Sequence, residues 1–382
     1  MDGLHLFHAF STFAPGGPQL RIIQIMRALG PSWSHTIMAM DRNFEAANRI
    51  QDLTNIQLCE PPKKGSSTLY PLAIHNTLKR AHPDVLITYN WGAIEAVAGG
   101  LIGSVCPIIH HEHGFGADEA AGPKRRRALA RRVLLNRIYK TIVPSKTLLD
   151  IALSTYKVRP EKVTLIRNGT DVERFRPQRN HTLRSQLGLG DGDVLFGYVG
   201  HLRPEKNLEL LIRAFVAAQI QGAKLILIGD GNCGEALQAV TKSLGAEGRI
   251  VFAGSSPDTV AYYAAMDVFV LSSVTEQMPM SLLEAMASAL PALCTDVGDV
   301  AEMLGNPGAP AVVPSENLEA YVSSLKALAS GAELRRRLGA RNRERCIAEY
   351  SLEKMVRLYE KEYRAAHASS GKHQTYVKRA GT

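Results

Sequence analysis

The chain alternates short apolar runs with longer segments of helical periodicity. In its first half the apolar runs lie at Leu4–Phe10, Thr36–Met40, Ile56–Leu58, Val85–Tyr89, Ile108–His111 and Ile142–Val143. Continuous apolar runs that alternate with helices are typical of parallel strands covered by helices on both faces. The pattern therefore predicts a doubly wound α/β sheet.

A second series of apolar runs follows a segment rich in turn-forming residues between Asn168 and Asp193. Its members lie at Val194–Gly200, Leu225–Gly229, Ile250–Gly254, Val268–Ser272 and Ala292–Thr295. Two series predict two Rossmann-like α/β domains, 1–180 and 181–350, with the boundary within 172–192. Helical patterns continue from 318 to 366, and the basic end, 369–382, predicts a flexible tail.

Length and composition agree with this division. A chain of 382 residues exceeds what one hydrophobic core usually organises, and 45% hydrophobic with 21% charged residues is typical of a globular protein. The five cysteines form no CxxC pair, which favours reduced thiols and a cytoplasmic location. No apolar stretch approaches the ~20 residues of a membrane span. We therefore expect a protein that is neither exported nor membrane-spanning.

The net charge of +9 indicates an anionic partner, which is a nucleic acid, a phosphorylated ligand or an acidic membrane surface. Residues 124–140 hold eight Lys or Arg and no acid, with Leu129, Val133 and Leu134 at helical spacing. This pattern predicts either a basic helix on anionic lipid or an ordinary solvated helix face. The candidate membrane-facing residues are Lys124, Arg125, Arg126, Arg127, Arg131 and Arg132.

The motif GHLRPEKN, Gly200 to Asn207, directly follows a predicted strand and opens a helix. Gly200 permits a tight turn, while Arg203 and Lys206 add two cations to a loop that leads into a helix N-terminus. Cations and helix-terminal amides together suit a diphosphate.

A second motif, TEQMPMSLLEAMASALP, contains Glu276 and Glu284 with seven residues between them. Pro279 is well suited to a helix start, because its missing N–H has no intrahelical partner there. The first carboxylate then lies in the preceding loop and the second in the second turn, where they address different parts of an extended ligand. The alternative, an ordinary surface acid at 284, is disfavoured by its apolar neighbours.

In this order and spacing the motifs resemble the retaining glycosyltransferases of family four, which have the GT-B fold. The resemblance covers most of the chain. It rests on Gly16-Gly17, the pair His113-Gly114, Pro144-Ser145, Asn168-Gly169 with Asp171, Phe175 and Pro177, GHLRPEKN, Gly229 to Gly231, and the two glutamates, Glu276 and Glu284.

The resemblance implies two Rossmann-like domains that face each other across a cleft. The N-terminal domain is expected to bind the acceptor and the C-terminal domain the nucleotide-sugar, and the helix at 351–368 is expected to cross back to the N-terminal domain. No cofactor and no metal are expected, because cations and amides replace the metal.

The resemblance also implies roles for individual residues. Lys206 is expected to bind the donor diphosphate, Glu276 the hydroxyls of the transferred sugar and Glu284 the ribose, while His113 lies near the reacting sugar. The expected catalytic residues are thus His113, Lys206 and Glu276. The expected donor-binding residues are Gly16, Gly17, Gly200, His201, Arg203, Lys206, Glu276, Met280, Ser281, Leu282 and Glu284.

The histidines in IIHHEHGFG raise the question of a metal site. On a strand, His111 and His113 share a face, but no further group of ligands has a persuasive spacing. We therefore expect no metal, and interpret His110 and His111 as packing or cleft-wall residues.

Two departures from the family pattern open alternatives. His201 stands where the family usually has arginine, and Gln277-Met278-Pro279 replaces a glycine-rich loop. They point to an altered donor preference or to a non-catalytic nucleotide-sugar binder, such as a scaffold of a polysaccharide-assembly complex. A nucleotide-sugar epimerase is a further alternative, disfavoured by the glutamate motif. A glycoside hydrolase would instead need two carboxylates that flank one bond at a defined separation.

The resemblance implies a hexosyltransferase-like enzyme that retains the anomeric configuration, with UDP-sugars favoured over GDP-sugars as donors. The expected acceptor is a carbohydrate or lipid-linked molecule, such as a precursor of an envelope or extracellular polysaccharide. The expected location is the cytoplasm, peripheral to the inner face of its membrane. A nucleic-acid partner is not expected, because the chain has no recognition module and no interleaving of aromatic and basic residues.

Overall fold

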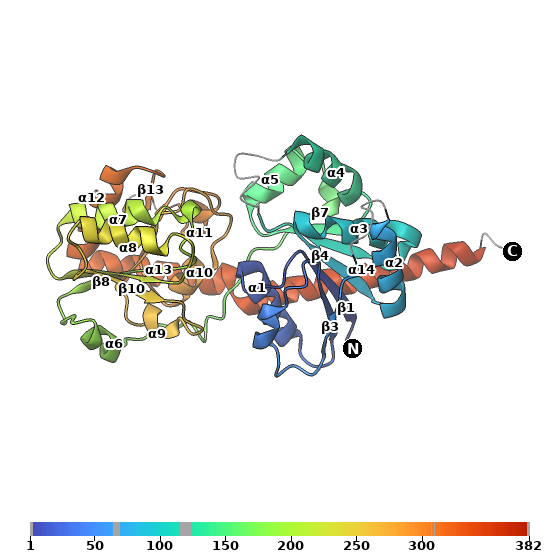
Figure 1. The fold of residues 1–382 in the computed structure, drawn as a ribbon, viewed down its shortest axis with the longest axis horizontal. Coiled ribbons are helices and arrows are strands. Elements are labelled where there is room, and N and C mark those ends of the chain that lie inside the picture. Colours follow the sequence, from blue (N-terminus) through green and yellow to red (C-terminus); the bar gives the residue numbers. More distant parts are fainter. Residues whose placement is uncertain (1–2, 64–68, 115–123, 307, 309, 380–382) are drawn as a thin grey trace. The chain divides into compact units, whose positions relative to one another are not determined.

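The computed structural model describes residues 3–63, 69–114, 124–306, 308 and 310–379. The chain forms two compact units (Figure 1). Unit 1 comprises residues 1–167 and 355–382, and unit 2 comprises residues 168–354.

Unit 1 is built on a seven-stranded parallel sheet with the strand order β3-β2-β1-β4-β5-β6-β7. Every residue of β4 is buried, as expected for a strand covered on both faces. The six predicted strands are confirmed, and a seventh short strand, β7, was not predicted. The strands are β1 (His5–Phe10), β2 (Ser34–Ala39), β3 (Ile56–Cys59), β4 (Val85–Tyr89), β5 (Ile108–His111), β6 (Lys140–Val143) and β7 (Val163–Leu165).

The α-helices of unit 1 contribute buried side chains to the core of this unit. They are α1 (Gly17–Leu29), α2 (Tyr70–Ala81), α3 (Ile94–Leu101), α4 (Arg125–Leu135), α5 (Lys146–Ser154) and, from residue 355 onward, α14 (Leu352–Arg379).

Unit 2 is built on a six-stranded parallel sheet with the order β10-β9-β8-β11-β12-β13. The five predicted strands are confirmed. The strands are β8 (Val194–Val199), β9 (Ala223–Ile228), β10 (Ile250–Gly254), β11 (Val268–Leu271), β12 (Ala292–Thr295) and β13 (Val312–Val313). The α-helices are α6 (His181–Gln186), α7 (Leu208–Ala218), α8 (Gly234–Ser243), α9 (Val260–Tyr263), α10 (Met280–Ala287), α11 (Val300–Met303), α12 (Leu318–Ser330) and α13 (Ala332–Tyr350).

Strand order reverses once in each sheet, next to β1 and β4 in unit 1 and next to β8 and β11 in unit 2. Ligands of open α/β sheets bind at the carboxyl ends of the strands at such points. In unit 2 this edge carries Gly200 after β8 and Glu276 after β11.

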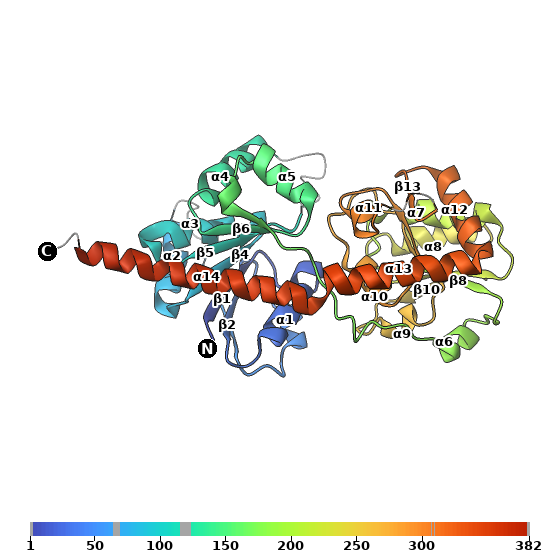
Figure 2. The same cartoon turned by 180° about the vertical axis from the view of Figure 1, so that it is seen from behind.

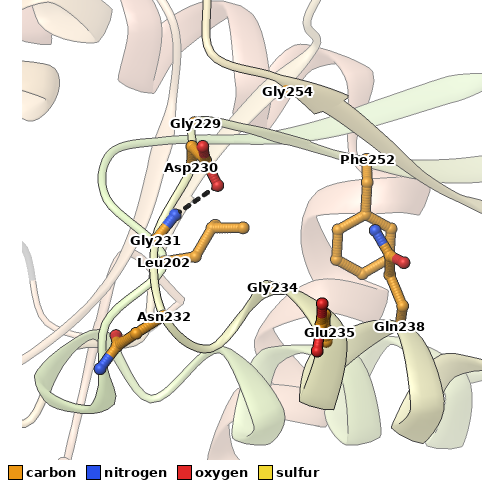
Figure 3. Close-up of a pocket in the computed structure, with 10 residues that line it drawn as sticks. All are labelled: Leu202, Gly229, Asp230, Gly231, Asn232, Gly234, Glu235, Gln238, Phe252 and Gly254. Carbon is orange, nitrogen blue, oxygen red and sulfur yellow. Dashed lines mark hydrogen bonds between the residues drawn. The ribbon is translucent and has the colours of Figure 1, made fainter.

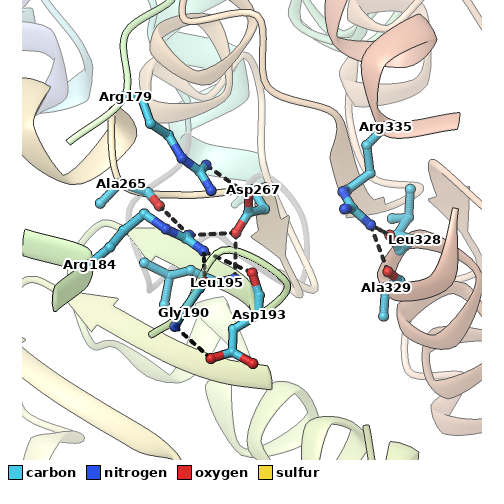
Figure 4. A network of polar contacts seen from close by, with 10 residues as sticks. All are labelled: Arg179, Arg184, Gly190, Asp193, Leu195, Ala265, Asp267, Leu328, Ala329 and Arg335. Carbon is cyan, nitrogen blue, oxygen red and sulfur yellow. Dashed lines mark hydrogen bonds and ion pairs between the residues drawn. The ribbon is translucent and has the colours of Figure 1, made fainter. Parts of the chain in front are cut away.

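The boundary between the units differs from the predicted one, because the turn-rich segment after residue 168 is bound to unit 2 (Figure 4). Arg184 is buried and donates to Asp267 at 2.7 Å and to the carbonyl of Asp193 at 2.8 Å. Asp267 also accepts from Arg179 at 2.8 Å and from the backbone N–H of Leu195 at 2.7 Å. These side-chain bonds attach the segment to the second sheet, and its turn-rich composition does not reveal them.

Helix α14 belongs to unit 1 from Met355 onward, and Figure 2 shows it in front of the sheet of that unit. Its Tyr359 stacks on His111 with ring centroids 5.2 Å apart, and Tyr363 packs at 6.4 Å from Trp33. The helix continues to Arg379, through most of the range predicted to be a flexible tail. Good helix formers such as Lys, Arg and Gln continue the helix beyond the packed tyrosines.

Helix α4 is oriented differently from the prediction. Arg131, predicted to face a membrane, is 1% exposed and pairs with Glu112, with 2.9 Å from Nε to Oε2. In contrast, Leu129 and Val133 are 61% and 44% exposed. Glu112 neutralises the Arg131 guanidinium inside unit 1, which allows it to be buried. The outer face of α4 combines the two apolar side chains with exposed cations.

Candidate active site

Two strand-end loops of unit 2 meet with almost no room between their backbones. A Cβ on Gly229 would lie 1.9 Å from the carbonyl oxygen of Gly200, and φ is positive at both residues. The N–H of Leu202 donates to the carbonyl of Asp230 at 2.9 Å. Only glycine tolerates this approach, which joins the loop that carries the cations to the loop after β9.

Lys206 and Glu276 form the central pair of this site. Lys206 ends the short 3₁₀ turn η6 (Pro204–Lys206), and its Nζ lies 2.6 Å from Oε1 of Glu276. The same oxygen accepts from the Ser273 hydroxyl at 2.8 Å. The side chains are 20% and 10% exposed. An ammonium group has three N–H donors, so Lys206 retains donors for a ligand.

The cation Arg203 is exposed and makes no ion pair with any residue that the structure describes. His201, two positions before it, stands at the loop entrance. Desolvation and the neighbouring charge of Arg203 lower the pKa of His201. His201 is therefore neutral at physiological pH, and the positive charge of this loop comes from Arg203 and Lys206.

The loop that carries Glu276 is held on two sides. A Cβ on Gly298, whose φ is +53°, would lie 2.1 Å from the carbonyl oxygen of Glu276. Asn168 donates its side-chain amide to the carbonyl of Met278 at 2.9 Å. The asparagine of the NGxD motif thus fixes the segment that replaces the family's glycine-rich loop.

Glu284 lies on α10, which starts directly after Pro279. It is half-buried, and the hydroxyl of Tyr263 lies 2.8 Å from its Oε2. Burial raises the pKa of Glu284 to about 7, although the hydrogen bond with Tyr263 and the charge of Arg174 lower it. The carboxyl is therefore poised to change protonation near neutral pH.

The remaining predicted donor-binding residues lie in the first turn of α10 and differ in burial. Met280 and Ser281 are half-buried, whereas the side chain of Leu282 is fully buried in the core of unit 2. The helical period turns Leu282 towards the sheet, so its side chain packs in the core.

A cavity of about 480 Å³ opens beside the two joined loops (Figure 3). It lies at the carboxyl ends of β9 and β10 and at the start of α8. Its lining combines glycine backbone, the Phe252 ring and polar side chains: Leu202, Gly229, Asp230, Gly231, Asn232, Gly234, Glu235, Gln238, Phe252 and Gly254. Leu202 links the cavity to the cation-bearing loop, four residues before Lys206.

Unit 1 brings together the glycine loop and His113. Gly16 is the N-cap of α1, and no atom lies within 4 Å of a Cβ built on Gly17, so the backbone there is open to a ligand. One turn into α1, Arg21 is buried and its Nη2 lies 2.6 Å from Nε2 of His113. Burial, with the charge of Arg21, lowers the pKa of His113. Arg21 was not among the predicted site residues. Its position on the helix that directly follows the glycine loop could have indicated it as one.

The other two histidines are packing residues, in agreement with the first of the two roles predicted for them. His110 and His111 are fully buried, and His110 Nδ1 lies 2.8 Å from the Thr88 hydroxyl. Within the described ranges, no three His, Cys, Asp or Glu side chains are grouped as a metal site would require. The expectation that the protein works without a metal stays a prediction.

Residues 180–345 match the family described as Glycosyl transferases group 1, and residues 15–174 match Glycosyltransferase Family 4. The chain belongs to the family-four glycosyltransferases. Its fold is GT-B, as the resemblance of the motifs implied.

Curated relatives of this glycosyltransferase are distant. It is 25% identical to N-acetyl-alpha-D-glucosaminyl L-malate synthase of Bacillus anthracis, over 60% of this chain and 57% of the relative. It is 24% identical to the UDP-Gal:alpha-D-GlcNAc-diphosphoundecaprenol alpha-1,3-galactosyltransferase of Escherichia coli, over 66% and 68%. The match to the first relative thus spans little more than half of that protein's length.

Solved structures support the fold. Anabaena HepE in complex with UDP superimposes with a TM-score of 0.82 at 17% identity, over 95% of this chain and all of that one. Sucrose-phosphate synthase from Thermosynechococcus elongatus gives 0.78 at 20% identity, over 96% of this chain and all of that one. The part of this chain that the structure describes contains no helix long and apolar enough to cross a bilayer.

Proposed function

We propose that this glycosyltransferase binds a nucleoside-diphosphate sugar at the carboxyl ends of β8 and β11 in unit 2. The pairing of Lys206 with Glu276 carries this proposal. Cleavage of the bond between the anomeric carbon and the diphosphate adds negative charge to the leaving group, which Lys206 and Arg203 stabilise. Glu276, held by Ser273, accepts hydrogen bonds from sugar hydroxyls.

In this proposal the nucleoside binds next to the diphosphate, at Glu284 and in the cavity. Glu284 accepts bonds from the ribose, and the 480 Å³ cavity with its Phe252 ring takes the base. UDP is favoured over GDP, and structures of the similar Anabaena HepE contain UDP and UDP-glucose. The roles predicted for Gly16, Gly17 and His113, which lie in unit 1, stay predictions.

The proposed reaction uses neither metal nor cofactor, since the two cations of the β8 loop neutralise the diphosphate. We propose retention of configuration, with the leaving phosphate accepting the proton of the acceptor hydroxyl. The anomeric proton signal of the product, followed by NMR, distinguishes retention from inversion.

The proposed acceptor is a lipid-linked or envelope-polysaccharide precursor at the cytoplasmic face of a membrane. The names of two relatives include a lipid: diphosphoundecaprenol for the Escherichia coli galactosyltransferase, and diacylglycerol for the alpha-monoglucosyldiacylglycerol synthase of Streptococcus pneumoniae. In this chain the outer face of α4 supports contact with anionic lipid, because it combines exposed cations with exposed apolar side chains. Its exposed residues are Lys124, Arg125, Arg126, Leu129, Arg132 and Val133.

The donor site is tested by titrating wild type, Lys206→Ala and Lys242→Ala with UDP, GDP and ADP in the presence of EDTA. Lys242 is an exposed lysine at the end of α8 and serves as the control. Loss of a charge-assisted hydrogen bond costs about 1.5–3 kcal/mol, so Lys206→Ala should bind the preferred nucleotide roughly 10–150-fold more weakly. Equal affinity of both variants, or binding only after a divalent ion is added, would contradict the proposal.

A further inference from the structure

The hydroxyl of Tyr263 lies between two oxygen atoms. It is 2.8 Å from Oε2 of Glu284 and 3.1 Å from the backbone carbonyl oxygen of Ser281. Tyr263 ends α9 and is buried, and its ring packs edge-on against Phe175 with centroids 5.6 Å apart. Burial and this aromatic contact hold the ring, which keeps the hydroxyl close to both oxygens.

A phenol carries one hydrogen, whereas an ionised carboxylate and a backbone carbonyl are both acceptors. When Glu284 is ionised, Tyr263 donates to the carboxylate and its bond to Ser281 is lost. When Glu284 is protonated, its O–H donates to the Tyr263 oxygen, and the tyrosine donates to Ser281. Only the protonated form satisfies all three groups at once.

The charged groups around this pair favour neither form strongly. Arg174 is the cation that acts on Glu284, and it is itself paired with Asp258 at 3.0 Å. Tyr198, on β8, also faces Tyr263 and is neutral. Burial opposes the negative charge, and these opposing effects bring the pKa of Glu284 to about 7.

We propose that Tyr263 is a positioning residue that couples donor binding to release of one proton from Glu284. The inference rests on the proposed function, in which Glu284 accepts hydrogen bonds from the ribose. These bonds require the ionised carboxylate. On binding, the carboxyl proton leaves to the solvent, the Tyr263 O–H turns from Ser281 to Oε2 of Glu284, and the other carboxylate oxygen receives the ribose hydroxyls.

The coupling predicts that donor affinity rises with pH. With a carboxyl that titrates near pH 7, the affinity for UDP should increase about tenfold between pH 6 and pH 8. At pH 7, about half a proton should be released per UDP bound, beyond what the UDP phosphate itself releases. Glu284→Gln keeps the shape but does not titrate, so its proton release measures the phosphate contribution alone.

The experiment is calorimetry of UDP binding to the full chain, from pH 6 to pH 9, in pairs of buffers with different ionisation enthalpies. Tyr263→Phe removes one hydrogen bond to the carboxylate, which raises the pKa of Glu284, and should move the pH dependence of affinity upward by about one pH unit. Tyr262→Phe is the matched control, because Tyr262 adjoins it on α9 and its hydroxyl bonds to none of the described residues. Thermal melts verify that each variant is folded.

The outcomes separate this inference from the proposed function. Weaker binding of Tyr263→Phe by the same factor at every pH indicates a purely structural tyrosine and overturns the coupling. UDP affinity and proton release that are the same in wild type and Glu284→Gln overturn it as well, while leaving the donor site intact. If the wild-type protein binds no nucleoside diphosphate, both proposals are overturned.

Discussion

The strongest test of the structure of unit 1 is the replacement of Arg131 by methionine. The guanidinium is 1% exposed, pairs with Glu112 at 2.9 Å, and lies 4.7 Å from the centroid of the Tyr156 ring and 5.1 Å from that of Trp91. Burial alone raises the pKa of Glu112, but the neighbouring His110 imidazole, 3.7 Å away, and the Arg131 guanidinium hold this pKa below its ordinary value. Removing Arg131 leaves the Glu112 carboxylate buried without its cation.

Breaking a buried ion pair by removing one partner costs about 3–5 kcal/mol. In a domain of 150–250 residues, 1 kcal/mol shifts the melting temperature by roughly 2–4 °C, so Arg131→Met should lower it by about 6–20 °C. Both tryptophans of the chain, Trp33 and Trp91, lie in unit 1. Tryptophan fluorescence during urea or thermal unfolding therefore reports on this unit, even if unit 2 unfolds separately.

The matched control is Arg132→Met, one residue along the same helix with an exposed side chain. It should change the free energy of unfolding by less than about 0.5 kcal/mol. The double variant Arg131→Met with Glu112→Gln should recover part of the loss, because it leaves no buried unpaired charge. If Arg131→Met and Arg132→Met are equally stable, Arg131 is not buried as described, and the orientation of α4 is wrong.

Two further predictions concern unit 1. Burial lowers the pKa of His35 to about 4, so the folded protein keeps it neutral while the unfolded chain binds a proton below pH 6.5. Stability present at pH 7 is thus lost as the pH falls towards 4, by about 3 kcal/mol for this residue; urea unfolding of His35→Leu should show a correspondingly weaker pH dependence. For the α4 face, replacing Arg125 and Arg126 by serine should weaken binding to phosphatidylglycerol vesicles roughly 30-fold, since each cation contributes ~1 kcal/mol near the surface. The same change at Arg336 and Arg337 on α13 should leave sedimentation with vesicles unaltered, and an equal loss in both pairs would refute a specific face.

The sequence determined the fold class and the positions of most strands. Apolar runs such as 85–89 and 194–200 are long enough, and regular enough in their alternation with helices, to specify parallel strands. The motifs around Lys206 and Glu276 also predict a diphosphate-sugar site, because ligands of open α/β sheets bind at the carboxyl ends of the strands. These features are local, and local pattern is what a sequence displays directly.

Only the tertiary structure decided which polar groups meet. The 2.6 Å contact between Lys206 and Glu276 joins residues on separate loops, and the pairing of Tyr263 with Glu284 depends on how α9 packs beside α10. Arg131 has the same local pattern as an exposed arginine, and its burial follows from Glu112 on a neighbouring strand end. Periodicity identifies a helix and its apolar positions, but strand order and packing determine whether a charge lies in solvent or beside a buried partner.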